Sequence, residues 1–356
     1  MGSPGEKPVI IVYHADCIDG AACAWIVAKA KGLDGDPQPS NVTYIPYGHH
    51  NAAESQQKIR DSLKSDAELY FVDLAPEKAF LDELMTSANG TDGTMQVSAI
   101  HIYDHHKTAA HNLKGYTSPN PRNAEPQLNI VIDDQRASAS AMVWGLMMPG
   151  QGSPVILGLI DKMDGDAVGL KTPADFAAAA LVDSYDISNP KSALETIKGL
   201  AKLSFMQAAR RGAPLAADQD QRLKKLLDHP HFVRLQLEPG AAPVDVPIVN
   251  ADLKAFGRRV SESLSELAKK HGSPAAFAWC MQANGAVTVS IRTCDGADAS
   301  LIADYMKATL PEATGGGHAG AAAVHFPSLV AFAIQLPTKT RPAQPPVKKD
   351  GHSPKI

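Results

Sequence analysis

The stretch IHIYDHHK, residues 100–107, decides how the whole chain is interpreted. Residues 97–103 form a short run rich in β-branched and aromatic side chains, which predicts a β-strand. Asp104, His105 and His106 follow directly after it. Open parallel sheets bind ligands at the carboxyl ends of their strands, and carboxylates and imidazoles are ligands for Mn, Zn or Fe ions. The stretch therefore suggests a metal site, and a polar turn that carries two histidines is the plainer alternative.

Length and composition set wide limits on the class of protein. With 356 residues, the chain is long enough for two domains with separate cores. A net charge of −4 gives no general attraction for nucleic acid, which disfavours a structural nucleic-acid-binding protein and requires a local site for any phosphate. The 4 cysteines form no CxxC pair, so reduced thiols and a cytoplasmic location are expected. No apolar stretch approaches the roughly 20 residues of a membrane span, so no membrane association is expected.

The first predicted strand ends in HADCIDG, residues 14–20, just before a predicted helix. His14, Asp16 and Asp19 therefore crowd one strand-to-helix turn. Two interpretations stay open for this turn. It binds a metal ion, or Asp19 caps the helix and His14 only fills space.

Acids recur at the ends of other predicted elements. A strand over residues 68–72 stops at Asp73, and an apolar helix over residues 155–162 brings Asp161 and Asp164 to one helix face. For the two helical acids, a polar helix end is the plainer interpretation. The alternation of strands and helices predicts an α/β fold, with a parallel sheet and helices on both faces. In that fold the acids at the strand ends meet along one edge of the sheet.

Four motifs, taken in order, resemble those of the DHH phosphoesterase superfamily. They are HxDxxDG at 14–20, VDLAP at 72–76, DHH at 104–106 and LIDKMD at 159–164. That superfamily includes RecJ exonucleases, nanoRNase/pAp phosphatases, cyclic-dinucleotide phosphodiesterases and family II pyrophosphatases, and the chain looks most like the nanoRNase/pAp phosphatase-like oligoribonuclease subgroup. Many members carry two acids one residue apart before the glycine, whereas Asp16 and Asp19 here are separated by two residues. His14 and Asp19 thus match the family's pattern better than Asp16.

A glycine-rich stretch in the second half extends the resemblance. GGGHAGAA, residues 315–322, follows a predicted strand that ends at Arg292, and this pair resembles the DHHA1 domain that accompanies DHH domains. The usual loop of that family has one more glycine and ends in AAG, whereas this one ends in AAA. Glycines let backbone N–H groups approach a phosphate, although such a loop on its own usually indicates flexibility. The residues that the resemblance implies for holding a nucleotide or its terminal phosphate are Arg292, Gly315, Gly316, Gly317 and His318.

The predicted domain organisation has four parts. Two connector helices are predicted over residues 191–211 and 215–228, interrupted by Gly-Ala-Pro at 212–214. A smaller α/β domain follows, with a hairpin of two strands across an Asn-Gly turn. The parts are a DHH catalytic domain (1–190), a helical connector (191–235), a DHHA1 substrate-binding domain (236–336) and a disordered tail (337–356) rich in proline and lysine.

The resemblance implies a centre of two Mn²⁺ ions, with Mg²⁺ as a substitute, about 3.5–4 Å apart. A water molecule between them would attack phosphorus in line. Asp73 would bridge the ions, because a carboxylate has two oxygens to share. The other implied ligands are His14, Asp19 and Asp16 on one side and His105 and Asp161 on the other.

Three further side chains receive supporting roles by the same resemblance. Asp104 is expected to orient His105, and His106 to contact the substrate phosphate or protonate the leaving oxygen. Asp164 is expected to lie behind the ligands. His49 and His50 are interpreted as solvated loop residues, with a substrate contact as the alternative.

The predicted activity is metal-dependent hydrolysis of short RNA or DNA oligonucleotides, or of other small nucleotides, to mononucleotides. Phosphatase action on 3′-phosphoadenosine 5′-phosphate (pAp) is included in this prediction. A cyclic or linear dinucleotide phosphodiesterase and a catalytically silent nucleotide-binding regulator stay open as alternatives. A family II pyrophosphatase is disfavoured, because its second domain differs from the GGGH type. A homodimer is compatible with all of these.

Overall fold

The computed structural model describes residues 7–48, 52–64, 66–87, 97–117, 127–164, 169–251, 259–282 and 284–336. The predicted tail at 337–356 lies outside these residues, as do His49 and His50. The chain divides into two compact units, residues 1–215 and 216–356. Each unit is described by itself.

The first unit is built on a five-stranded sheet in the order β2-β1-β3-β4-β5, with every neighbouring pair parallel. The strands are β1 (Val9–His14), β2 (Val42–Tyr47), β3 (Ala67–Val72), β4 (Val97–Asp104) and β5 (Gln127–Ile132). The helices are α1 (Ile18–Ala30), α2 (Ala52–Ser62), α3 (Lys78–Ser87), α4 (Lys107–Asn112), α5 (Ala139–Met147), α6 (Val155–Asp164), α7 (Pro173–Asp183) and α8 (Pro190–Leu200). The predicted α/β class is confirmed.

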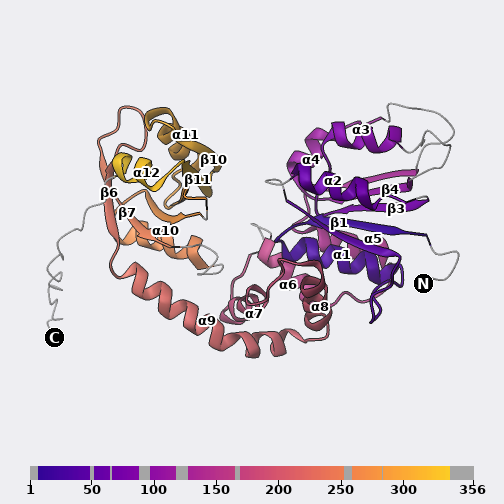
Figure 1. The fold of residues 1–356 in the computed structure, drawn as a ribbon. Coiled ribbons are helices and arrows are strands. Elements are labelled where there is room, and N and C mark those ends of the chain that lie inside the picture. Colours follow the sequence, from indigo (N-terminus) through magenta and orange to yellow (C-terminus); the bar gives the residue numbers. More distant parts are fainter. Residues whose placement is uncertain are drawn as a thin grey trace. The chain divides into compact units, whose positions relative to one another are not determined.

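Helices cover both faces of this sheet. Ile10 and Val12 of β1 share a core with Ile59 of α2 and Leu81 of α3, and α1 and α5 lie on the opposite face (Figure 1). Ile11, between those two β1 residues, is also 0% exposed. A continuous apolar run is what a strand buried on both faces requires, because its alternate side chains point to opposite sides.

The register of the three central strands aligns their carboxyl ends. Tyr13 of β1 pairs with Val72 of β3, and Val72 pairs with Tyr103 of β4. His14 and Asp73 each stand one residue beyond this row, and so does Asp104 on β4. The predicted meeting of the strand-end residues follows from this alignment.

The predicted interruption at 212–214 is wrong. Helix α9 runs without a break from Phe205 to Leu227 and contains Pro214. It begins instead at a capping box, in which Gln207 N–H donates to Ser204 Oγ at 3.3 Å and Ser204 N–H donates to Gln207 Oε1 at 2.8 Å. The Ser-x-x-Gln pattern was the sequence signal for this start.

Gly212 serves helix packing. A Cβ atom added there would collide with the Ala177 carbonyl oxygen of α7. The two helices can therefore lie this close only because residue 212 has no side chain. Pro214 follows two residues later within the same helix.

Replacing Gly212 with alanine should lower the free energy of unfolding by about 2 kcal/mol or more, because the new methyl group has no room. Gly199→Ala is the matched control, since Gly199 lies inside α8 with open space around its Cβ position. That change should be neutral or stabilise by about 0.5–1 kcal/mol. Urea unfolding of both variants measures the difference, and equal stabilities would contradict the packing argument.

The second unit contains a six-stranded sheet in the order β10-β11-β9-β8-β7-β6. Its strands are β6 (His231–Leu235), β7 (Val244–Asn250), β8 (Ala275–Met281), β9 (Val287–Thr293), β10 (Thr314–His318) and β11 (Ala321–Phe326). Only β7 and β8 pair in parallel. The predicted hairpin is confirmed as β8–β9, although residue 283 of its turn lies outside the described residues.

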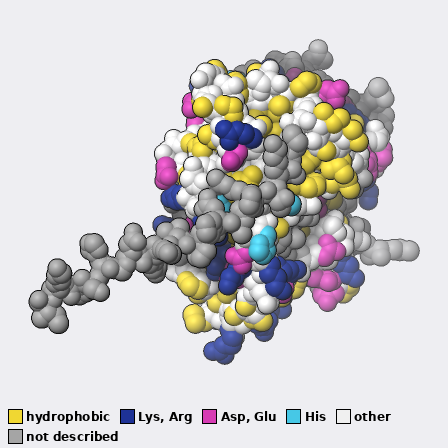
Figure 2. All heavy atoms as spheres, turned by 90° about the vertical axis from the view of Figure 1, so that its left-hand side faces the viewer, with side chains coloured by type: hydrophobic (Ala, Val, Ile, Leu, Met, Phe, Trp, Pro, Cys, Tyr) yellow, Lys and Arg dark blue, Asp and Glu magenta, His cyan; other side chains and the backbone are white. Residues whose placement is uncertain are grey.

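Two cores flank this second sheet. Helices α11 (Ala299–Thr309) and α12 (Leu329–Gln335) contribute Ile302 and Phe332 to the larger one, and α10 (Val260–Lys270) contributes Leu264 to the other. The face of the molecule in Figure 2 mixes basic, acidic and hydrophobic side chains. Within the described ranges, every helix is too short or too polar to cross a bilayer.

Candidate metal centre

Asp73 lies at the centre of a group of potential metal ligands. It is 1% exposed and follows β3 in a left-handed backbone conformation (φ 59°), which aspartate tolerates better than most residues. Its N–H donates to Tyr103 O at 2.9 Å and so continues the ladder to β4. One carboxylate oxygen, Oδ2, lies 3.5 Å from His14 Nδ1, and the other, Oδ1, lies 3.3 Å from His105 Nε2. The carboxylate thus faces a different histidine with each oxygen.

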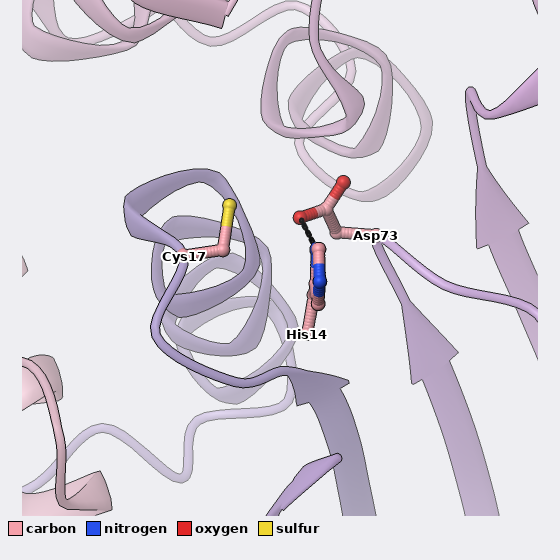
Figure 3. A group of neighbouring side chains, drawn as sticks. All are labelled: His14, Cys17 and Asp73. Atoms are coloured by element: carbon pink, nitrogen blue, oxygen red, sulfur yellow. Dashed lines mark ion pairs between the residues drawn. The ribbon is translucent and has the colours of Figure 1, made fainter. Parts of the chain in front are cut away.

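On one side, Asp73 is grouped with His14 and Cys17. The ligand atoms of these three residues lie within 4.8 Å of one another. Figure 3 shows His14 at the end of β1, Cys17 in the turn before α1 and Asp73 after β3. Burial raises the pKa of the Cys17 thiol well above its usual range, and the charges of Asp73 and Asp19 add to this effect. Cys17 is not predictable as a ligand from the sequence, because a single cysteine without a second in CxxC spacing gives no metal signal.

On the other side, His105 is grouped with Asp19 and Asp164. His105 Nε2 lies 3.3 Å from Asp164 Oδ2 and 4.0 Å from Asp19 Oδ2. Its Nδ1 lies 3.3 Å from the carbonyl oxygen of Arg136. A hydrogen bond there holds the proton on Nδ1 and points Nε2 at the acids, as metal-binding histidines require.

Asp19 is fixed by the start of α5. It is 0% exposed, and its oxygens accept hydrogen bonds from Ala139 N–H at 2.7 Å and Ser140 N–H at 3.0 Å. Burial raises the pKa of Asp19 well above its usual range, and the negative charge of Asp73 raises it further. Asp19 does not cap its own helix, because Cys17 is the N-cap of α1.

The histidines beside Asp73 counteract the effect of burial on its pKa. Burial alone would raise the pKa of the Asp73 carboxyl, but His105 and His14 outweigh it and hold the pKa at about 2. Burial would lower the pKa of His105, but Asp73 and Asp19 outweigh it and raise this pKa to about 9. The acids around His105 Nε2 therefore attract positive charge to this position.

Asp104 holds the ring of His106, whereas the sequence analysis expected it to orient His105. Its Oδ1 lies 2.7 Å from His106 Nδ1, and accepts hydrogen bonds from the N–H groups of His105 at 2.7 Å and His106 at 3.2 Å. The hydrogen bond that His106 donates to Asp104 raises the pKa of His106. The reason is geometric: the turn after β4 brings His106 back over Asp104, and Arg136 O reaches His105 instead. His106, Asp73 and His105 form a third possible ligand group.

Asp164, rather than Asp161, belongs to the clustered acids. Asp161 Oδ1 accepts a hydrogen bond from Ser138 Oγ at 2.9 Å and is in none of the three groups. The two acids lie on the same face of α6, but Asp164 is one turn nearer the helix end and reaches His105. Asp16 is exposed, with φ 54°, and also stands outside the groups.

The donor set suits divalent cations. Both oxygens of Asp73 and Nε2 of His105 are buried, and within the described ranges they have no hydrogen-bond partner. Buried polar atoms are normally hydrogen-bonded, and three carboxylates close together repel one another unless a cation compensates them. Carboxylate oxygens suit Mg or Mn, imidazole nitrogens suit Zn or Fe, and a thiolate sulfur would favour Zn. These residues could therefore hold metal ions.

The predicted phosphate-binding residues lie in the second unit. Arg292 is half-buried, with Nε donating to Ser261 Oγ at 2.9 Å and Nη1 to Ile291 O at 2.9 Å. It pairs in register with Ala321, which pairs with His318.

The glycine triplet is not the loop that the sequence predicted. Gly315, Gly316 and Gly317 belong to β10, the strand at the edge of the sheet, which pairs with β11. A Cβ atom at Gly315 or Gly317 would collide with the backbone of β11. Close packing of β10 on β11 therefore explains why these two positions are glycine.

Comparisons with known proteins complete the description. No family model and no curated protein matches the chain. Among solved structures, it is similar to RecJ from Thermus thermophilus in complex with Mn²⁺ (13% identity, TM-score 0.43, covering 91% of this chain and 50% of that one). It is also similar to exonuclease RecJ bound to manganese (15%, TM-score 0.41, 91% and 86%) and to CDC45 from Entamoeba histolytica (8%, TM-score 0.45, 92% and 94%). The chain spans about half of the Thermus RecJ. Likenesses at this level do not carry an activity from those proteins to this chain.

The two acids of α6 offer a matched pair for a binding test. Asp164→Asn should weaken Mn²⁺ binding by about tenfold or more, because it removes a charge 3.3 Å from His105 Nε2. Asp161→Asn should bind Mn²⁺ nearly as the parent chain does, since an asparagine oxygen can still accept from Ser138. Titration of the metal-free proteins followed by electron paramagnetic resonance measures both. A larger loss in the Asp161 variant would reverse the assignment.

Proposed function

We propose that this chain is a metal-dependent phosphoesterase that hydrolyses short oligonucleotides to mononucleotides, and pAp among small nucleotides. One observation carries the proposal: the buried Asp73 carboxylate faces ligand groups on both sides and makes no hydrogen bond through either oxygen within the described ranges. A carboxylate so placed can be shared by two cations. The choice of Mn²⁺, with Mg²⁺ as a substitute, rests on the resemblance of the four motifs.

The ligands divide into two sets around Asp73. His14, Cys17 and Asp73 would hold one cation. Asp19, His105 and Asp164, beside the other oxygen of Asp73, would hold the second. Such cations, when bound, acidify a water molecule and neutralise charge on phosphoryl oxygens. This assignment replaces Asp161 and Asp16 of the sequence prediction with Asp164 and Cys17.

His106 is the proposed proton donor to the leaving oxygen. Its side chain is 42% exposed, so substrate can reach it, and Asp104 beneath it is 1% exposed. The hydrogen bond to Asp104 fixes the ring and raises the pKa of His106, which keeps a proton available near neutral pH. Loss of the Asp104 carboxylate would remove both effects at once.

The proposed substrate class is supported by the net charge of the chain and by residues of the second unit. The net charge of −4 favours small substrates over long strands, which require extended basic surfaces. Arg292, with Nη2 not used in its bonds to Ser261 and Ile291, stays the proposed contact for a terminal phosphate, together with Gly315–His318. A cytoplasmic location is part of the proposal.

The decisive assay measures Mn²⁺-dependent release of mononucleotides from end-labelled RNA and DNA. We expect fast cleavage of dinucleotides to pentamers, slow cleavage of long strands, and release of phosphate from pAp but not from pyrophosphate. Asp73→Asn should lower turnover by about 10²-fold or more, because it weakens both cation sites. Asp61→Asn, a change to an acid of α2 that lies outside the ligand groups, is the control and should retain activity.

Three other results would change the conclusion. Preference for cyclic or linear dinucleotides alone would make the chain a dinucleotide phosphodiesterase. Tight nucleotide binding without hydrolysis of any substrate would favour the silent regulator. Full activity in the Asp73 variant would overturn the shared-carboxylate centre.

A further inference from the structure

A hollow of about 760 Å³ lies in the first unit, away from the clustered acids. Its walls come from the later turns of α1, the segment after α1, β2 and α8, and include Trp25, Lys29, Tyr44 and Lys198. Asp19 stands ten residues before Lys29 on α1, which corresponds to about 15 Å along the helix. None of the clustered ligands lines this hollow, and its volume is in the range of sites for small molecules, roughly 300–1,000 Å³.

Four lysines line the hollow, and in the described part of the chain none of them forms an ion pair. The acids Asp34, Asp36 and Glu195 also line the hollow. Lys198 Nζ donates to the carbonyl oxygen of Asp34 at 2.6 Å, which holds that amino group in place. The lysines are Lys29, Lys191, Lys198 and Lys202.

Trp25 adds a second, independent feature. It is 4% exposed, and its indole Nε1 is buried with no hydrogen-bond partner in the described part of the chain. Buried tryptophans usually find a partner for this N–H. One side of the ring system is stacked on Trp144, with centroids 6.0 Å apart, and Lys29 Nζ lies 5.9 Å from the ring centroid. An indole donor without an acceptor, beside lysines that form no ion pair in the described part of the chain, points to a ligand that offers oxygen atoms.

Apolar groups complete the lining. Leu33 and Leu194 are buried there, and Tyr44 and Pro154 are partly exposed beside them. An inorganic anion alone would leave these surfaces uncovered. A ligand with a planar or apolar body and a phosphate at one end would use both parts of the hollow.

We propose that this hollow binds a small phosphate monoester with an aromatic body, of the nucleoside monophosphate class. The phosphate would be held by lysine amino groups, and a ligand oxygen would accept from Trp25 Nε1–H. The site is separate from the metal centre and does not depend on the proposed activity.

Binding of adenosine monophosphate to the full chain by isothermal titration calorimetry tests the proposal. Excess EDTA keeps cations, and with them the metal centre, out of the measurement. Lys29→Ala and Lys191→Ala should each weaken binding by about tenfold, as expected for loss of a charged hydrogen bond to phosphate. Trp25→Phe, which keeps an aromatic ring without the N–H, should weaken it less. Lys58→Ala removes an exposed lysine of α2 outside the hollow and should leave the affinity unchanged.

Comparison ligands and a metal-centre variant distinguish this hollow from the metal centre as the place of binding. Asp73→Asn should bind adenosine monophosphate as the parent chain does, and a loss there would assign the binding to the metal centre and overturn the proposal. Adenosine and inorganic phosphate should each bind at least about tenfold more weakly than the whole nucleotide. If inorganic phosphate bound as tightly as adenosine monophosphate, the proposed aromatic body of the ligand would be wrong. If adenosine monophosphate did not bind at all, the proposed site would be overturned.

Discussion

The structure of the first unit depends on a carboxylate that is buried where three parallel strands end. Asp73 is 1% exposed, and within the described ranges neither of its oxygens forms a hydrogen bond. A buried anion is costly unless positive charge lies close to it. His105, whose pKa is raised to about 9, supplies such charge beside Oδ1, and a ring nitrogen of His14 lies 3.5 Å from Oδ2. The parallel order β1-β3-β4 is therefore what makes the carboxylate tolerable, because it delivers one histidine to each oxygen.

Neighbouring elements add further acids and hold the histidines in place. Asp19 is held by the first N–H groups of α5, and Asp164 comes from the last turn of α6. Burial and the negative charge of Asp73 raise the pKa of Asp19, whereas His105 and His14 outweigh burial at Asp73 and hold its pKa at about 2. The Arg136 carbonyl and the Asp104 carboxylate each fix one imidazole ring. No single element makes the site, since its parts come from segments far apart in sequence.

The sequence predicts the site residues that stand at strand ends. It does not predict features that are decided by how one element packs on another. His14, Asp73 and His105 could be predicted because a parallel sheet aligns the carboxyl ends of its strands. The choice between Asp161 and Asp164 depends on how α6 packs, since both lie on one helix face. Gly212 was interpreted as a helix break because its contact, the Ala177 carbonyl, is distant in sequence. The glycine triplet was taken for a loop for the same reason: its partner strand β11 decides its conformation.

Helix α1 connects the clustered acids, at its first residues, with the lysine-lined hollow, at its last turns. All its residues from Ile18 to Ala28 are buried, against the sheet and the helices around it. Such burial explains its alanine-rich sequence, because small side chains let neighbours approach from every side. A helix so enclosed has little freedom to shift, and ligands held on packed helices are positioned better than ligands on loops. Asp19 at its start is therefore held by a packed helix, and Trp25, which is 4% exposed on the same helix, belongs to the wall of the lysine-lined hollow.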